Sequence, residues 1–152
     1  MTNRFASLGL AVEKPFRVEL VHPVSGILLT GKDGTQAYVD VLSTDSKKAR
    51  QIQDEQNDRR FGAKVRTNLT SQQLRANVTD ILAGLTTGWY LVDLDGNPMD
   101  ITFSESAARE LYDFPDASWI RDQVDAAASN RANFTPKPAT ISTASQENGA
   151  AG

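Results

Sequence analysis

The sequence lacks cysteine altogether and contains a single histidine, His22, among 152 residues. A chain without cysteine can form neither a disulfide framework nor a thiolate metal site, and one histidine cannot build a histidine-based zinc site. No run of about 18 apolar residues occurs that could cross a membrane, and the first residues do not form a secretory signal. We therefore expect a soluble protein with no cofactor, no metal and no membrane association, which stays in the compartment where it is made.

A strong positive charge is also missing. The formal net charge is −3 and the sequence pI is about 5.1. Binding to nucleic acid needs clustered Lys and Arg that displace counterions from the phosphates, so we expect no nucleic-acid partner. The hydrophobic content of 39% is enough for one domain with a core of its own.

Motifs that would indicate catalysis are absent as well. His22 lies in a His-Pro turn, and no Ser, Cys or paired carboxylate is linked to it by a motif. Residues 31–34, Gly-Lys-Asp-Gly, lack the ending and the length of a phosphate-binding loop. Residues 93–97 imitate the start of an EF-hand, but Pro98 and Ser104 stand where that loop needs Gly and Glu. An Asp-rich and Asn-rich turn explains the same residues, and the sequence indicates a protein that is not an enzyme.

The pattern that is present begins with alternating, strand-like segments. Apolar-rich stretches are separated by turns that contain Gly and Asp, and the predicted strands are 16–21, 26–30 and 36–42. We expect residues 16–42 to form a small antiparallel β unit, packed against a helix or another copy because three short strands are not stable alone. Residues 1–15 ahead of it are expected to form a flexible arm.

Residues 43–134 are predicted to form a helical domain. The first helix, 43–61, begins with N-capping Ser and Asp residues but has little apolar surface besides Ile52 and Phe61. It is therefore either a solvated connecting helix or a surface that faces a partner. The second helix, 70–85, begins with a Thr-x-x-Gln capping box, and helical spacing predicts a buried stripe of Leu74, Val78, Ile81, Leu82 and Leu85.

The rest of this domain is expected to be a ribbon or an irregular loop followed by an αα-hairpin. Residues 86–103 contain an Asp-Gly hairpin turn, and Trp89 is expected to enter the core. Ser104 caps a short helix that stops at Phe114-Pro115. A second helix, capped by Asp116 or Ser118, places on one face Trp119, Ile120, Val124 and Ala127.

The predicted fold class is therefore α+β, and it ends in a tail with little to bury. Residues 135–152 consist mainly of Pro, Thr, Ser, Ala and Gly. Such a composition cannot offset the entropy lost on ordering the chain, so this tail is expected to be disordered.

The order of motifs in the second half resembles the tail assembly chaperones of long-tailed bacteriophages. The resemblance rests on three pieces: residues 89–112, in which Trp89 and an Asp-Gly-Asn-Pro turn lead into a Ser-Glu-Ser-Ala helix; residues 119–124, Trp-Ile-Arg-Asp-Gln-Val; and residues 130–134, Asn-Arg-Ala-Asn-Phe. It covers roughly residues 40–134. Ser106 stands where Asn is common in that family.

The resemblance implies a non-enzymatic protein that binds the tape measure protein, keeps it soluble and promotes polymerisation of the tail tube around it. In many relatives a frameshifted extension recruits the tail tube protein, and several copies or a homo-oligomer act together. Such a protein works in the host cell cytoplasm and is absent from the mature virion. The alternative is a permanent structural component of the phage tail or of the head-tail connection.

The C-terminal hairpin is the first candidate for a partner-binding face, and the helix 43–61 is the second. The same apolar side chains could instead be core, and both interpretations stay open for Trp119 and Phe134. The candidate residues are Trp119, Ile120, Val124, Phe134, Ile52 and Phe61.

Overall fold

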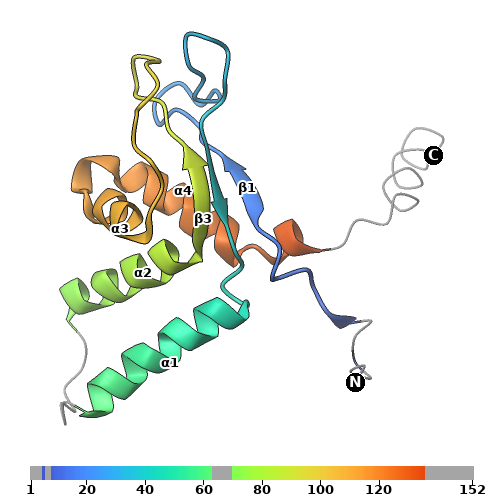
Figure 1. Ribbon diagram of the computed structural model, residues 1–152, viewed down its shortest axis with the longest axis vertical. Coiled ribbons are helices and arrows are strands. Elements are labelled where there is room, and N and C mark those ends of the chain that lie inside the picture. Colours follow the sequence, from blue (N-terminus) through green and yellow to red (C-terminus); the bar gives the residue numbers. More distant parts are fainter. Residues whose placement is uncertain (1–4, 6–7, 63–69, 136–152) are drawn as a thin grey trace.

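A computed structural model describes residue 5 and residues 8–62 and 70–135. It confirms the predicted α+β class, with one three-stranded antiparallel sheet and four α-helices within the described residues (Figure 1). The elements, in chain order, are β1 (Phe16–Glu19), β2 (Tyr38–Val41), α1 (Lys47–Gly62), α2 (Ser71–Leu85), β3 (Thr86–Tyr90), α3 (Glu105–Asp113), the 3-10 turn η2 (Pro115–Ala117), α4 (Ser118–Ser129) and the 3-10 turn η3 (Arg131–Phe134).

The third strand of the sheet comes from a different part of the chain than predicted. The sheet order is β1-β2-β3, and Val41 pairs with Phe16 on one side and Thr86 on the other. The prediction of a regular strand over residues 26–30 is wrong. This segment forms isolated bridges, from Leu28 to Val21 and from Thr30 to Gln36, and Leu29 exchanges single backbone hydrogen bonds with Leu20 and Ala37 (2.8 Å each). Tight turns at Gly26 and Gly34, both with positive φ, return the chain before a longer ladder can form.

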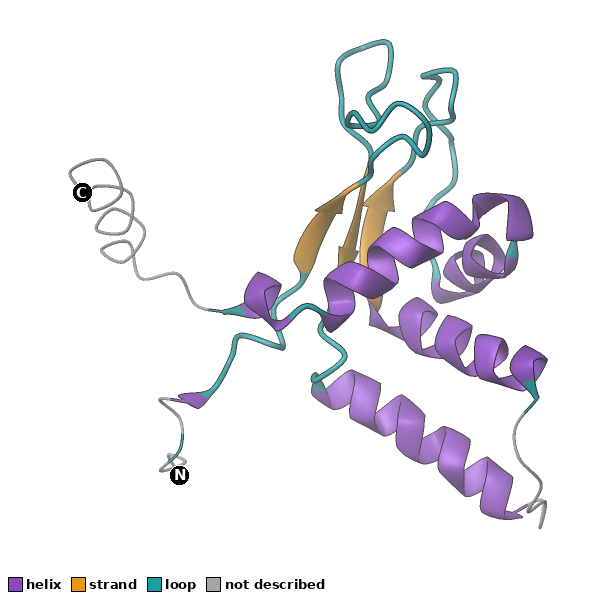
Figure 2. Cartoon of the chain, turned by 180° about the vertical axis from the view of Figure 1, so that it is seen from behind, coloured by secondary structure: helices purple, strands orange, loops and turns teal. Residues whose placement is uncertain are grey.

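The predicted β unit (16–42) and the predicted helical domain (43–134) share one hydrophobic core. Its fully buried side chains include Leu20 and Val39 from the first segment and Leu82 and Val124 from the second. The sheet packs against α4, which crosses one of its faces (Figure 2). The Gln123 side chain fixes α4 to the chain beyond β1, since its Oε1 accepts from the Val21 N–H (2.9 Å) and its Nε2 donates to the Val21 carbonyl (2.8 Å).

Helix α2 begins as predicted but buries only part of its apolar stripe. The capping box is present, with the Thr70 hydroxyl accepting from the Gln73 N–H and the Gln73 side chain accepting from the Thr70 N–H. The stripe is buried at its C-terminal end, whereas Leu74 is 51% exposed and Val78 is 38% exposed. The polar helix α1 lies alongside α2 (Figure 1) and offers few apolar groups to cover that end, which is why the prediction of a fully buried stripe is wrong.

Helices α3 and α4 form the predicted hairpin with one difference at its turn. Ser104 caps α3 by accepting from the Ala107 N–H (3.0 Å), and α3 ends before Phe114. Neither predicted residue caps α4, because the 3-10 turn η2 runs directly into the helix and Ala117 occupies the N-cap without a side-chain bond. Pro115 opens this turn, where its fixed φ is favourable.

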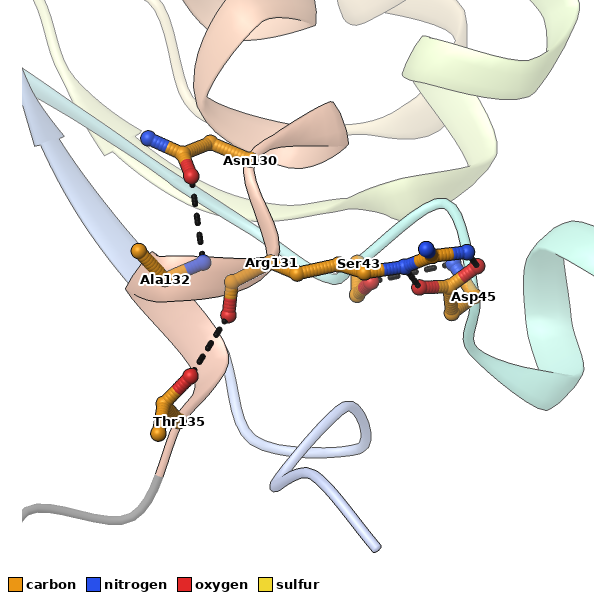
Figure 3. A network of polar contacts seen from close by, with 6 residues as sticks. All are labelled: Ser43, Asp45, Asn130, Arg131, Ala132 and Thr135. Atoms are coloured by element: carbon orange, nitrogen blue, oxygen red, sulfur yellow. Dashed lines mark hydrogen bonds and ion pairs between the residues drawn. The ribbon is translucent and has the colours of Figure 1, made fainter.

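The chain end after α4 is tied to both α1 and β1. Arg131 reaches the Asp45 carboxylate ahead of α1, with 2.8 Å between Nε and Oδ2, and Asn130 caps η3 through the Ala132 N–H (Figure 3). Phe134 is 3% exposed and meets the Phe16 ring edge-on, with 6.1 Å between centroids. The closing Asn-Arg-Ala-Asn-Phe motif therefore has a structural role.

Part of the predicted N-terminal arm contacts this closure. The Ala11 N–H donates to the Phe134 carbonyl (2.7 Å), and the Glu13 carboxylate accepts from the Lys47 N–H at the start of α1 (2.8 Å). Residues 1–4, 6–7 and 136–152, which hold the rest of the predicted arm and nearly all of the predicted tail, lie outside the described residues.

Candidate functional site: an apolar groove

A groove of about 910 Å³ lies between the ribbon that follows β3 and the hairpin of α3, η2 and α4. Of the two alternatives, ribbon and irregular loop, the structure has the ribbon. The Met99 N–H donates to the Leu91 carbonyl and the Asp93 N–H to the Asn97 carbonyl, each over 2.9 Å, and Gly96 turns the chain with φ of 87°. The Asp-Gly turn chemistry thus sets one wall of the groove.

The Asp93 carboxylate is occupied by this turn. Its Oδ1 accepts from the N–H groups of Asp95 and Asn97, each over 2.9 Å. These donors, with the Asn97 N–H the stronger influence, lower the pKa of the Asp93 carboxyl. Residues 93–97, which imitate the start of an EF-hand, therefore form a turn held by the Asp93 carboxylate.

The groove is lined mainly by hydrocarbon side chains, and several of them are exposed. Leu94 is 54% exposed, Ile101 44% and Met99 42% on the ribbon, and Phe114 is 53% exposed beyond the end of α3. Leu91, Val92 and Ile120 are buried beneath them. Because large apolar side chains gathered around one hollow are uncommon on a surface that meets only water, this groove is the best candidate for a contact site.

Both tryptophans of the chain line this groove. Trp89 packs against the core but stays half-buried, its Nε1 donates to the Ile101 carbonyl (2.9 Å) and its ring meets Phe103 edge-on at 5.2 Å. Trp119, at the start of α4, is also half-buried. Rigid aromatic side chains with satisfied polar atoms are typical of contact surfaces.

The six residues proposed from the sequence divide between the groove and other places. Trp119 and Ile120 line the groove, whereas Val124 is fully buried in the core and Phe134 is 3% exposed in the C-terminal closure. The burial of Val124 and Phe134 assigns them to packing. Ile52 packs toward Gly84 of α2, where an added Cβ would collide with it. Phe61 lies in the last turn of α1, and its side chain is outside the described part of the chain.

A second, polar cleft of about 640 Å³ lies between α1, α2 and α3. Its Arg109 is paired within the fold, with Asp80 at 3.1 Å and with Glu105 at 3.5 Å. An arginine whose charge is already matched by two carboxylates has less to offer a ligand. The apolar groove is therefore the stronger candidate.

Sequence reasoning missed the ribbon and turn residues of the groove. Leu94, Met99 and Ile101 fall within the segment 86–103, for which the sequence predicts only backbone structure, and Phe114 only marks the end of a predicted helix. The available signal was the presence of large apolar residues inside an Asp-, Gly-, Asn- and Pro-rich turn segment, where polar residues are usual. The fold brings the exposed apolar residues of the ribbon and Phe114 of the hairpin turn together on one surface.

The described residues contain no group of three or more His, Asp or Glu side chains placed to hold a metal ion. None of the helices they form has the length and hydropathy needed to span a membrane. Comparison of the chain with protein-family models, with curated proteins and with solved structures gave no match.

Proposed function

We propose that this chain is a tail assembly chaperone of a long-tailed bacteriophage, which binds the tape measure protein, keeps it soluble and promotes tail tube polymerisation around it. The observation that carries the proposal is the open apolar groove of about 910 Å³ with exposed Leu94, Met99 and Phe114. A long helical partner with apolar faces needs temporary cover, and an apolar groove on a small folded domain supplies it.

The make-up of the groove supports binding rather than chemistry. Its walls are mainly aromatic and aliphatic, and the indole nitrogen of Trp89 is already bonded within the fold. Apolar grooves of this kind hold helices by burying side chains at helical spacing. The motif residues that carry the family resemblance meet here, since Trp89 and Trp119 both line the groove.

The remaining parts of the proposal concern partners and place. In it the chain acts in several copies in the host cell cytoplasm, the tail tube protein is recruited through a frameshifted extension, and the chaperone leaves before the virion matures. Copies acting side by side would cover successive stretches of a long partner.

Co-expression with the tape measure protein encoded nearby tests the proposal directly. The tape measure protein should become soluble and should co-purify with the wild-type chain. Phe114→Ala should reduce both, whereas Leu74→Ala should not, because Leu74 has a similar exposed fraction on α2 (51% against 53%) and lies outside the groove. Failure of the wild-type chain to solubilise or bind the partner would contradict the proposed function.

Mass spectrometry of purified particles separates the chaperone from a permanent virion component. A chaperone that leaves the tail should be missing from mature particles, whereas a structural component should be present in a fixed ratio to the other tail proteins. Stoichiometric presence would replace the proposed role with the structural one.

A further inference from the structure

Three exposed carboxylates stand among the residues that line the apolar groove: Glu110 and Asp113 on α3, and Asp116 in η2. We infer that the groove binds an amphipathic helix whose apolar face is flanked by Lys or Arg side chains. The inference rests on the proposed function for the identity of the protein that carries this helix, a segment of the tape measure protein.

The charge of the groove is one-sided. The residues that line it include Asp93 as a fourth carboxylate and no Lys, Arg or His. The ion pairs of the described residues do not include Glu110, Asp113 or Asp116. Carboxylates three residues apart on one helix repel each other, so cations from a partner would relieve this repulsion as well as pair with the groove.

The return segment of the ribbon is a poor template for an extended partner. Met99 and Asn97 direct their bonded backbone groups into the ribbon, and Pro98 between them, which pairs with Val92, has no N–H to donate outward. Addition of a strand needs a row of free backbone groups, whereas a helix satisfies its own backbone and contributes only side chains. The exposed apolar groups of the groove are suited to such side chains.

The chain itself is less complementary to the groove. A second copy carries a net charge of −3, so its approach is opposed by like charge at long range. Residues 136–152 contain one Lys, one Ile and no Leu, Met, Phe or Trp, a composition without an apolar helical face. The charge and the apolar lining together therefore indicate a basic, amphipathic segment of another protein.

A pair of synthetic peptides tests the inference with the full chain. Each has about 18 residues, which is long enough to sustain a helix, and presents the same leucine face; one is flanked by lysines and the other by glutamates. Binding is followed by tryptophan emission, because both tryptophans of the chain line the groove. The lysine peptide should shift the emission and bind at least about tenfold more tightly at low salt, and this preference should shrink in high salt.

Charge variants show whether the lysine peptide uses these carboxylates. The triple variant of Glu110→Gln, Asp113→Asn and Asp116→Asn should weaken the lysine peptide by about two- to fivefold per carboxylate replaced. A control triple makes the same change in net charge at exposed carboxylates outside the groove: Asp54→Asn, Asp58→Asn and Asp125→Asn. The control should bind the lysine peptide as the wild type does.

Several outcomes would overturn the inference. These are equal binding of the two peptides, equal weakening by the two triple variants, and a dimer of the chain that Phe114→Ala dissociates, which would make a second copy the occupant. If the lysine peptide binds but the tape measure protein does not co-purify, the groove chemistry stands and the proposed function fails. If the tape measure protein co-purifies equally with the wild type and with the Glu110, Asp113 and Asp116 triple variant, the proposed function stands and the inference about the groove carboxylates fails.

Discussion

The hydroxyls of Thr86 and Tyr112 lie 2.7 Å apart where β3 meets α3, and both side chains are buried. The Thr86 hydroxyl is also 2.7 Å from the Leu82 carbonyl, to which it donates. Because a threonine hydroxyl has a single proton, Tyr112 is the donor to Thr86. This chain of hydrogen bonds joins α2, β3 and α3 beneath the groove.

Thr86→Val should destabilise the protein by more than the loss of the Thr86 hydroxyl bonds, because it also leaves a buried group of Tyr112 without a partner. The buried Tyr112 hydroxyl would lose its partner, at a cost of about 1–3 kcal/mol in the free energy of unfolding. Adding Tyr112→Phe removes the orphaned hydroxyl and should recover part of that loss. The Leu82 carbonyl keeps the Thr86 N–H. Urea unfolding of the two single variants and the double variant measures this coupling, and strictly additive effects would contradict it.

Stability at alkaline pH should depend on Tyr112. Burial raises the pKa of its hydroxyl from 10.0 to about 12. The folded state therefore holds this proton after the unfolded state has released it. The associated stability is present below pH 10 and is lost as the pH rises through about 12, by about 3 kcal/mol at about 1.4 kcal/mol per pKa unit. The difference in unfolding free energy between wild type and Tyr112→Phe should follow this change, and a constant difference would exclude it.

Gln123→Glu should lower the free energy of unfolding by an amount that depends on pH. A carboxylate at position 123 can still accept from the Val21 N–H but would face the Val21 carbonyl without a proton to donate. We expect a loss of about 1–3 kcal/mol at neutral pH. Because the folded state favours the protonated carboxyl, its pKa is raised, and the stability returns relative to wild type as the pH falls through it.

Gln123→Ala provides the control for that variant. It removes both hydrogen bonds and introduces no titratable group, so its defect relative to wild type should be independent of pH. Equal pH profiles for the two variants, measured by urea unfolding, would show that the Val21 contacts do not set the effect.

The pKa of Asp45 should report the ion pair with Arg131. The Arg131 side chain donates to this carboxylate and lowers the pKa of Asp45. The stability from this pair is present above the unfolded pKa and is lost as the pH falls through the folded one. In Arg131→Gln the Asp45 pKa, followed by NMR titration, should rise toward its ordinary value. Arg17→Gln, which breaks the separate pair with Asp40, should leave the Asp45 pKa unchanged.

The starts of α2 and α3 and the end of α3 could be predicted because their signals are local. The hydrogen bonds of Thr70 and Ser104 run to N–H groups three residues ahead, and Pro115 stops α3 through its immediate neighbour. The pairing of Val41 with Thr86 lies across two helices and leaves no periodic mark in the chain. That pairing had to come from the three-dimensional structure, and with it the position of the ribbon.

The groove could be predicted only in part for the same reason. Trp119 and Ile120 were found from helical spacing, but that spacing places Val124 on the same face, and only packing shows that Val124 is in the core. Phe114 and Leu94 lie in turns, where apolar periodicity carries no information. Their shared surface depends on the ribbon folding back over α3.

Phe114 at the turn of the C-terminal hairpin and Phe134 after α4 should respond differently when the side chain is replaced by Ala. Phe134 is 3% exposed and packs on Phe16, so Phe134→Ala should lower the free energy of unfolding by about 3–5 kcal/mol. Phe114 is 53% exposed, so Phe114→Ala should change it by less than about 1 kcal/mol while weakening binding of the lysine peptide at least about tenfold. Urea unfolding and tryptophan emission measure the two effects on the same samples. A large stability loss in Phe114→Ala would mean that this ring belongs to the core. Unchanged binding of the lysine peptide would mean that the groove is not the contact surface.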